Sequence, residues 1–219
     1  MSQHVFSQLI ATVTGVLLLS AILQIGGRSL VRSIGLLAVQ GAALAALVLT
    51  VGLNAGEPQV WLVAAIVLVM KSIVLPAALL RAAKLIGETR ERPTTINPAV
   101  ELIGAAGLTL VAYIVGVPLA DSDPDPARQA LPVGFSLVLL GFWLLLIRRS
   151  AITQLVGFLV LDNGIATVSF LASGGLPLTV ELGASLDVLL VVLILGVLVV
   201  RMQRQQGHTD ITELKELHD

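Results

Sequence analysis

The sequence predicts an all-α integral membrane protein with seven transmembrane helices. Of its 219 residues, 56% are hydrophobic and only 12% are charged, and the mean hydropathy is +0.97. This composition lies far from that of soluble domains. Seven apolar runs approach or exceed the roughly 20 residues that a membrane-spanning helix needs. The basic residues also fall into alternate connections between these runs, as an odd number of helices requires.

The seven helices are predicted from apolar length and from the polar residues that bound each run. The first run lacks the basic start and the small-residue cleavage site of a removable signal peptide, so we expect it to be a retained helix. The fifth run is the shortest. The predicted segments are residues 5–25, 30–53, 60–82, 97–117, 131–147, 150–172 and 178–200.

The distribution of lysine and arginine predicts the orientation. The first, third and fifth connections and the C-terminal tail contain 11 of the 13 basic residues. The opposite connections contain only Arg128, together with Glu57 and the acidic run 121–125. Because basic connections stay in the cytoplasm, we expect the N-terminus outside, the C-terminus inside, and residues 205–219 as a cytoplasmic tail after a transmembrane domain of residues 1–204.

The residue types exclude most cofactors from this chain. It has no cysteine, so it supplies no thiolate to an iron–sulfur cluster or a nickel centre. Its three histidines, His4, His208 and His218, all lie in the tails, which argues against a haem within the membrane. We therefore expect no catalytic residue, metal or cofactor in this chain, and any redox chemistry belongs to partners.

Three charged residues are predicted to lie near the middle of the bilayer: Lys71 in the third helix, Asp162 in the sixth and Asp187 in the seventh. At about 1.5 Å per residue, each lies about 15 to 21 Å from a basic residue at the predicted cytoplasmic end of its helix. A charge at this depth costs roughly 2.5 to 3.5 kcal/mol. We expect the lysine to pair with the acids, either as a proton relay or as a purely structural buried ion pair.

Several further residues are candidates for auxiliary roles. Asn163 adds hydrogen-bonding groups beside Asp162, and Ser169 lies on the same stripe of that helix. Pro76 follows Lys71 by five residues and is expected to kink the third helix, which would free a backbone carbonyl and admit water near the lysine.

Two glutamates are predicted about one turn inside their helices. Glu101 lies in the fourth helix on the cytoplasmic side, and Glu181 lies in the seventh on the outer side. Both are either auxiliary proton-transfer groups or interfacial residues, and Glu101 is also favoured by the positive end of its helix dipole.

A weak internal similarity predicts a parallel repeat. GLLAVQG (35–41) and GFLVLDNG (157–164) both place a glycine five residues before a polar residue, and both follow an apolar helix and two basic residues. We predict that helices one to three (about 5–82) and five to seven (about 131–200) are two copies joined by a connector helix (about 97–117). Gln40 and Lys71 then correspond to Asp162 and Asp187.

The chain resembles hydrogenase-4 component E, a membrane subunit of formate hydrogenlyase-type complexes, over nearly its whole length. Its last third is also similar to the NuoK-type subunit of respiratory complex I and to the related subunit of multisubunit cation/proton antiporters. At position 162, where glutamate is expected in this family, the chain has aspartate. The resemblance rests on KSIVLP (71–76), LDNGI (161–165), ELGASLD (181–187) and the ending 201–217.

The resemblance implies a non-redox, non-catalytic subunit of a proton-translocating oxidoreductase in a prokaryotic plasma membrane. Its implied partners are antiporter-like membrane subunits, a peripheral hydrogenase-type redox module and membrane lipids, with no nucleic acid. Two alternatives remain open, a purely structural adaptor of the membrane arm and a subunit of a cation/proton antiporter. An autonomous transporter is disfavoured by the small size and by the lack of an inverted repeat.

Overall fold

The computed structural model describes residues 2–56, 58–86, 97–121 and 125–173, and within these ranges every secondary-structure element is a helix. Six helical stretches in this part of the chain are long and apolar enough to cross a membrane. They are α1 (Gln3–Gly26), α2 (Leu30–Ala55), the continuous stretch α3 (Val60–Val67), η1 (Leu68–Val74) and α4 (Leu75–Ile86), α5 (Pro98–Ala120), α6 (Pro126–Gln129) with α7 (Leu131–Ile147), and α8 (Ala151–Ser173). The predicted seventh crossing, 178–200, lies outside the described residues, and Glu181 and Asp187 lie there with it.

The helix ends follow from capping residues in the sequence. The Ser2 hydroxyl accepts a hydrogen bond from the Val5 N–H at the start of α1. Asn97 does the same for the Ala99 N–H at the start of α5, which has Pro98 at its first position. Gly56 ends α2 with a φ of 74°, a left-handed conformation that glycine adopts without strain. The predicted boundaries therefore differ from the observed ones by only a few residues.

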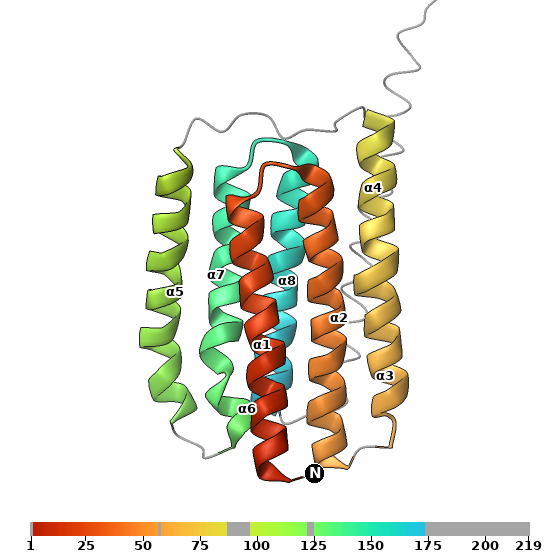
Figure 1. Cartoon of the computed structure of the whole chain (residues 1–219), viewed down its shortest axis with the longest axis vertical. Helices are drawn as coiled ribbons and strands as arrows, with labels where there is room; N and C mark the ends of the chain where they lie inside the picture. The colour runs from red at the N-terminus through yellow and green to blue at the C-terminus, as the bar shows by residue number, and fades with distance from the viewer. Residues whose placement is uncertain (1, 57, 87–96, 122–124, 174–219) are drawn as a thin grey trace, which may run out of the picture.

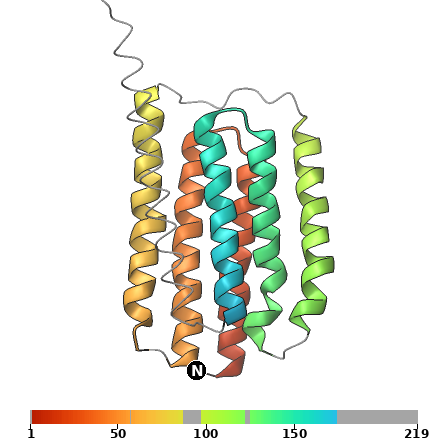
Figure 2. The same cartoon turned by 180° about the vertical axis from the view of Figure 1, so that it is seen from behind.

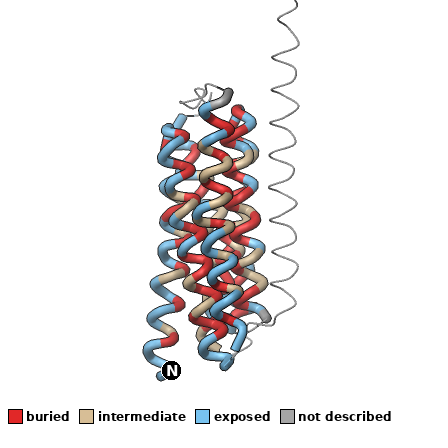
Figure 3. Tube along the Cα trace, turned by 90° about the vertical axis from the view of Figure 1, so that its right-hand side faces the viewer, coloured by how far each residue is buried: buried red, intermediate tan, exposed pale blue. Residues whose placement is uncertain are grey.

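Four helices form the centre of the bundle. Figures 1 and 2 show α1, α2, α7 and α8 packed side by side, with α5 against α7 at one edge and α3–α4 against α2 at the other. Burial agrees with this arrangement, because 61% of the apolar window of α2 is buried but only 17% of that of α5. Figure 3 shows the buried residues alternating with exposed ones around the described helices.

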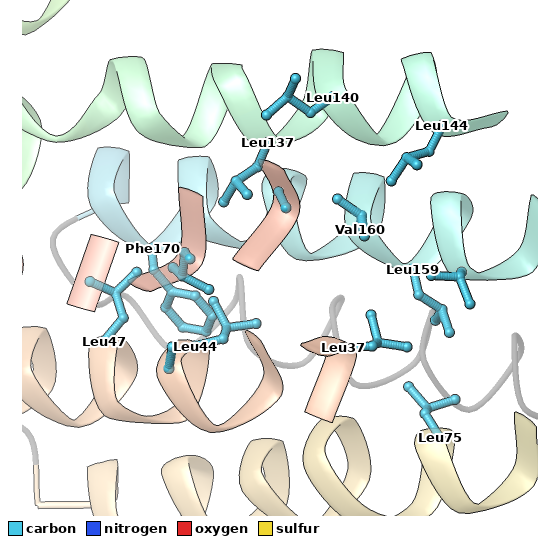
Figure 4. Packing of buried hydrophobic residues seen from close by; sticks show 14 of the residues in the cluster. Leu37, Leu44, Leu47, Leu75, Leu137, Leu140, Leu144, Leu159, Val160 and Phe170 are labelled. Atoms are coloured by element: carbon cyan, nitrogen blue, oxygen red, sulfur yellow. The ribbon is translucent and has the colours of Figure 1, made fainter. Parts of the chain in front are cut away.

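The interior between the central helices is filled by leucine, valine and phenylalanine side chains (Figure 4). Close helix approach adds to this packing, which matters because lipid supplies little hydrophobic drive for helices to associate. A Cβ atom on Gly141 would lie 2.3 Å from the Leu161 nitrogen, and one on Gly164 would lie 2.5 Å from the Val138 nitrogen. Helices α7 and α8 are therefore in backbone contact.

Six of the eight basic residues in the described part of the chain gather at one end of the bundle, while Lys71 lies between the ends and Arg128 lies in α6 at the opposite end. The α1–α2 and α7–α8 connections, the end of α4 and the start of α5 lie at this end, opposite the N-terminus (Figure 1). They contain Arg28, Arg32, Arg81, Lys84, Arg148 and Arg149. We call this the basic end and the opposite one the acidic end, after Asp121 and Asp125. Which end faces the cytoplasm stays a prediction.

The two central hairpins are built alike. Residues 27–29 connect α1 to α2, and residues 148–150 connect α7 to α8, so both connections have three residues. The predicted repeat pairs these two hairpins, but its last helix lies outside the described residues. The repeat and the division at residue 204 therefore stay predictions.

Candidate polar site within the membrane bundle

Lys71 and Asp162 form a buried ion pair between the third crossing and α8. The Lys71 Nζ lies 2.5 Å from Asp162 Oδ2, and the two residues are only 5% and 7% exposed. They are separated by 91 positions in the sequence, so the pair joins the two halves of the bundle. In a low-dielectric interior each charge compensates the other, and removing either one leaves the other without a partner of opposite sign.

Two buried amides extend the ion pair toward α1. Lys71 Nζ also donates to Asn163 Oδ1 at 3.1 Å, and Asn163 Nδ2 donates to Gln40 Oε1 at 3.4 Å. Gln40 Nε2 in turn donates to the Leu17 carbonyl at 3.4 Å. We call these four side chains the polar cluster: Asp162, Lys71, Asn163 and Gln40. Each is at least nine-tenths buried.

The lysine is carried by the π-helical segment η1, where the backbone hydrogen bonds span one residue more than in an α-helix. The cause is in the sequence, because Pro76 has no N–H to donate to the Ser72 carbonyl and its ring crowds that carbonyl. The Leu75 N–H accordingly donates to the Met70 carbonyl, five residues back. The sequence predicts a kink at Pro76, and the structure has a π-helical segment just before this proline.

Helix α2 holds this turn at close range. A Cβ atom on Gly41 would lie 2.5 Å from the Lys71 carbonyl carbon and 2.7 Å from the Ser72 nitrogen, so only glycine fits there. The Ser72 hydroxyl donates to the Ala38 carbonyl of α2 at 2.9 Å. These contacts fix the height of Lys71 opposite Asn163.

We expect Gly41→Ala to destabilise the protein by about 1–3 kcal/mol, because its methyl group collides with backbone atoms that cannot rotate away. The matched control is Gly35→Ala on the same helix, where an added Cβ meets nothing within 4 Å. That control should be neutral or slightly stabilising because alanine favours helix. Thermal unfolding in detergent measures both variants, and equal midpoints would contradict the close approach of α2 to η1.

Other predicted residues lie away from the cluster. Glu101 is in the first turn of α5 and is only 2% exposed within the bundle. The indole N–H of Trp143 donates a hydrogen bond to the backbone carbonyl of Glu101 at 3.1 Å. Ser169 is partly buried nearly two turns beyond Asp162 on α8 and takes part in none of the cluster's hydrogen bonds described above. Thr167 is fully buried between them and donates to the Asn163 carbonyl.

Arg148 has a structural position that sequence reasoning missed. The sequence predicts only that Arg148 is one of the cytoplasmic basic residues. In the structure it is 4% exposed, and its Nη2 lies within 3.1 Å of the carbonyls of Gln24, Ile25 and Gly27. It thereby caps the C-terminus of α1 from the α7–α8 connection. No sequence signal separates it from the exposed Arg149 beside it.

A carboxylate and an ammonium group thus share one buried hydrogen-bonded network, and the two amides orient them. Within the described residues there is no cluster of three or more histidine, cysteine, aspartate or glutamate side chains of the kind that holds a metal ion.

Comparison with known proteins places the chain in a family. It is 40% identical over 220 residues to the uncharacterized protein Rv0085 of Mycobacterium tuberculosis, and the match covers 100% of both chains. The chain belongs to the same family as Rv0085. No family model and no solved structure matches it.

The Rv0085 family has more distant relatives whose names describe a complex. The chain is 24% identical over 211 residues to hydrogenase-4 component E of Escherichia coli, covering 96% of this chain and 98% of that protein. Hydrogenase-4 component E of Shigella flexneri matches to the same extent. The sequence resemblance to component E is therefore supported as a distant relationship over most of the chain.

Proposed function

We propose that this Rv0085-family chain is a non-redox membrane subunit of a hydrogenase-type, complex I-related oxidoreductase, and that the polar cluster relays protons through it. Two findings support membership of such a complex, the six membrane-spanning stretches in the described residues and the distant relationship to hydrogenase-4 component E. The observation that carries the relay is the buried Lys71–Asp162 pair. The membrane would be a prokaryotic plasma membrane.

The proposed relay works through the pairing itself. While Lys71 lies against Asp162, the carboxylate is stabilised in its charged form by the ammonium group. A charge change in a neighbouring subunit that draws Lys71 away leaves the carboxylate without compensation in a dry site, so it takes up a proton. Return of the lysine expels the proton. Asp187 is proposed as a second proton carrier, with Glu101, Glu181 and Ser169 as auxiliary groups.

The amides of the cluster favour a moving lysine over a fixed one. Lys71 Nζ has a second acceptor in Asn163 Oδ1, so it can leave the carboxylate without losing every hydrogen bond. Asn163 is itself held by Gln40 on α2. A purely structural adaptor, the alternative, would use the same contacts only to hold the helices together, and it predicts that neutralising Asp162 leaves proton translocation unchanged.

Purification of the tagged full-length chain from native membranes in mild detergent tests membership of a complex. We expect it to elute with several large membrane proteins and with a module whose nickel and iron are detected by metal analysis, because this chain has no cysteine to bind those metals. Mass spectrometry identifies the partners. A chain that purifies alone as a stable, monodisperse protein would instead indicate an autonomous membrane protein.

A further inference from the structure

The polar cluster continues along α1 toward the basic end. The Leu17 carbonyl accepts two hydrogen bonds, one from Gln40 Nε2 at 3.4 Å and one from the Ser20 hydroxyl at 2.8 Å. Ser20 is 3% exposed, so its side chain lies inside the bundle. One carbonyl thus joins the cluster to the next polar residue on the inner face of α1, and the Ser20 oxygen keeps the capacity to accept a further hydrogen bond.

Gln24 lies one turn beyond Ser20 on the same face and is only 1% exposed. Neither Nε2 nor Oε1 of its side chain has a hydrogen-bond partner among the described residues. An unsatisfied buried polar group costs about 1–3 kcal/mol, so this amide is an unusual residue for a merely structural position. Its backbone carbonyl is already engaged by Arg148, which leaves the side chain as the polar group facing inward.

A second polar side chain lies at the level of Gln24. Helices α1 and α2 run antiparallel, and the Gln40 side chain reaches the Leu17 carbonyl. Seven residues closer to the connection on each helix, Gln24 and Ser33 therefore lie at the same level along the bundle axis. Ser33 is 4% exposed. Two amide atoms and a hydroxyl are enough to hold an internal water, which needs two to four polar partners.

Toward the acidic end, α1 lines a separate pocket of about 540 Å³ together with α5, α6 and α7, and Thr14 is one of its lining residues. Thr14 is the next buried polar residue toward the acidic end, and its hydroxyl donates to the Ile10 carbonyl at 2.7 Å within its own helix. Side chains at positions i and i+4 lie about 6 Å apart on a helix, a gap that one water bridges with two hydrogen bonds. Gln24, whose buried side chain has no hydrogen-bond partner among the described residues, lies on the basic-end side of the cluster.

We propose that the inner face of α1 lines a water-filled proton path from the basic end to the Lys71–Asp162 pair, with Gln24 and Ser33 holding its outer water and Ser20 the next. This inference rests on the proposed relay, since it names the route by which protons reach it. A proton enters on a water molecule, and each transfer breaks one O–H bond as the next forms along the chain. The last transfer forms the O–H bond of Asp162, while the amides of Gln40 and Asn163 orient the waters and carry no proton themselves.

Cysteine accessibility tests the path independently of proton translocation. The natural chain contains no cysteine, so Gln24→Cys and Ser20→Cys each introduce a single thiol. Only a hydrated thiol ionises and reacts with a charged, membrane-impermeant thiosulfonate reagent. The matched controls are Leu23→Cys and Leu19→Cys, the immediate neighbours, whose side chains are 49% and 57% exposed toward the outside of the bundle.

We expect cysteines at 24 and 20 in the assembled complex to react when the reagent is added at the basic side of membrane vesicles, and to stay unmodified when it is added at the other side. The controls should react only with a neutral, membrane-permeant reagent. Unreactive cysteines at both 24 and 20, or reaction from the acidic side, would overturn the path, even if the relay residues prove essential.

Gln24→Leu separates a proton path from a packing role. Because leucine has nearly the size of glutamine but cannot hold a water molecule, we expect severalfold slower proton-coupled turnover with an unfolding temperature that does not fall. Unchanged turnover in this variant would also overturn the path. If instead the cysteines react as expected but Asp162→Asn leaves translocation intact, the path stands and the proposed relay fails.

Discussion

Asp162→Asn is expected to abolish proton translocation while leaving the complex assembled. Asparagine has nearly the same shape, so Lys71 loses its counter-charge but keeps hydrogen-bond acceptors at positions 162 and 163, whereas Lys71→Met loses the charge and the hydrogen bonds together. Asparagine cannot take up or release a proton, so the relay loses its carrier. Proton uptake by inverted membrane vesicles, measured with a pH-sensitive dye during electron-donor oxidation, should fall to the background level, and the subunit content should be unchanged.

Asp162→Glu is the matched control for this change. It restores the carboxyl group on a chain one methylene longer, which is also the residue expected at this position from the resemblance to component E. We expect it to retain most of the translocation activity, because Lys71 on a flexible side chain can adjust to the extra length. Full translocation by an assembled Asp162→Asn complex would rule out the relay and favour the structural adaptor.

Lys71→Met is expected to have the largest effect on stability. Methionine preserves the length and apolar stem of lysine but leaves Asp162 buried without its cation, and breaking a buried pair in this way costs about 3–5 kcal/mol. A marked loss of thermal stability and of assembled protein in the membrane, relative to the natural chain, is the expected measurement.

The double variant Lys71→Met with Asp162→Leu shows whether that loss comes from the stranded charge. Replacing both ions by apolar side chains of similar size is often neutral for stability, so we expect the double variant to recover most of what the single variant loses. Translocation should remain absent. A double variant as unstable as Lys71→Met alone would mean that the lysine contributes through packing and the π-helical turn, and not through its charge.

The sequence predicts the bundle well because length, apolarity and capping decide where membrane helices begin and end. All six described crossings lie where the apolar runs predict them, and the meeting of Lys71 with Asp162 follows from their equal depth and from the cost of an isolated charge in lipid. Pro76 predicts a kink, and the structure has a π-helical segment at that place.

The remaining contacts depend on which helices are neighbours, and spacing along one helix does not contain that information. Gln40 was predicted as the counterpart of Asp162 in a repeat, but it is the α2–α8 contact that brings it to Asn163. The burial of Arg148 and of Gln24 depends on the packing of the α1 C-terminus against the α7–α8 connection. Such residues become visible only when the helices are placed in space.

The ion pair also imposes an order on biogenesis. Lys71 enters the bilayer in a crossing whose mean hydropathy of 2.4 is high enough to carry one charge, but its partner lies 91 residues further along the chain. At 5–20 residues per second, the ribosome reaches Asp162 roughly 5–20 s later. Until then the nascent protein must shelter a lone ammonium group, at the insertion machinery or by extending it to the lipid headgroups, so the third crossing packs against α8 only after α8 has been synthesised.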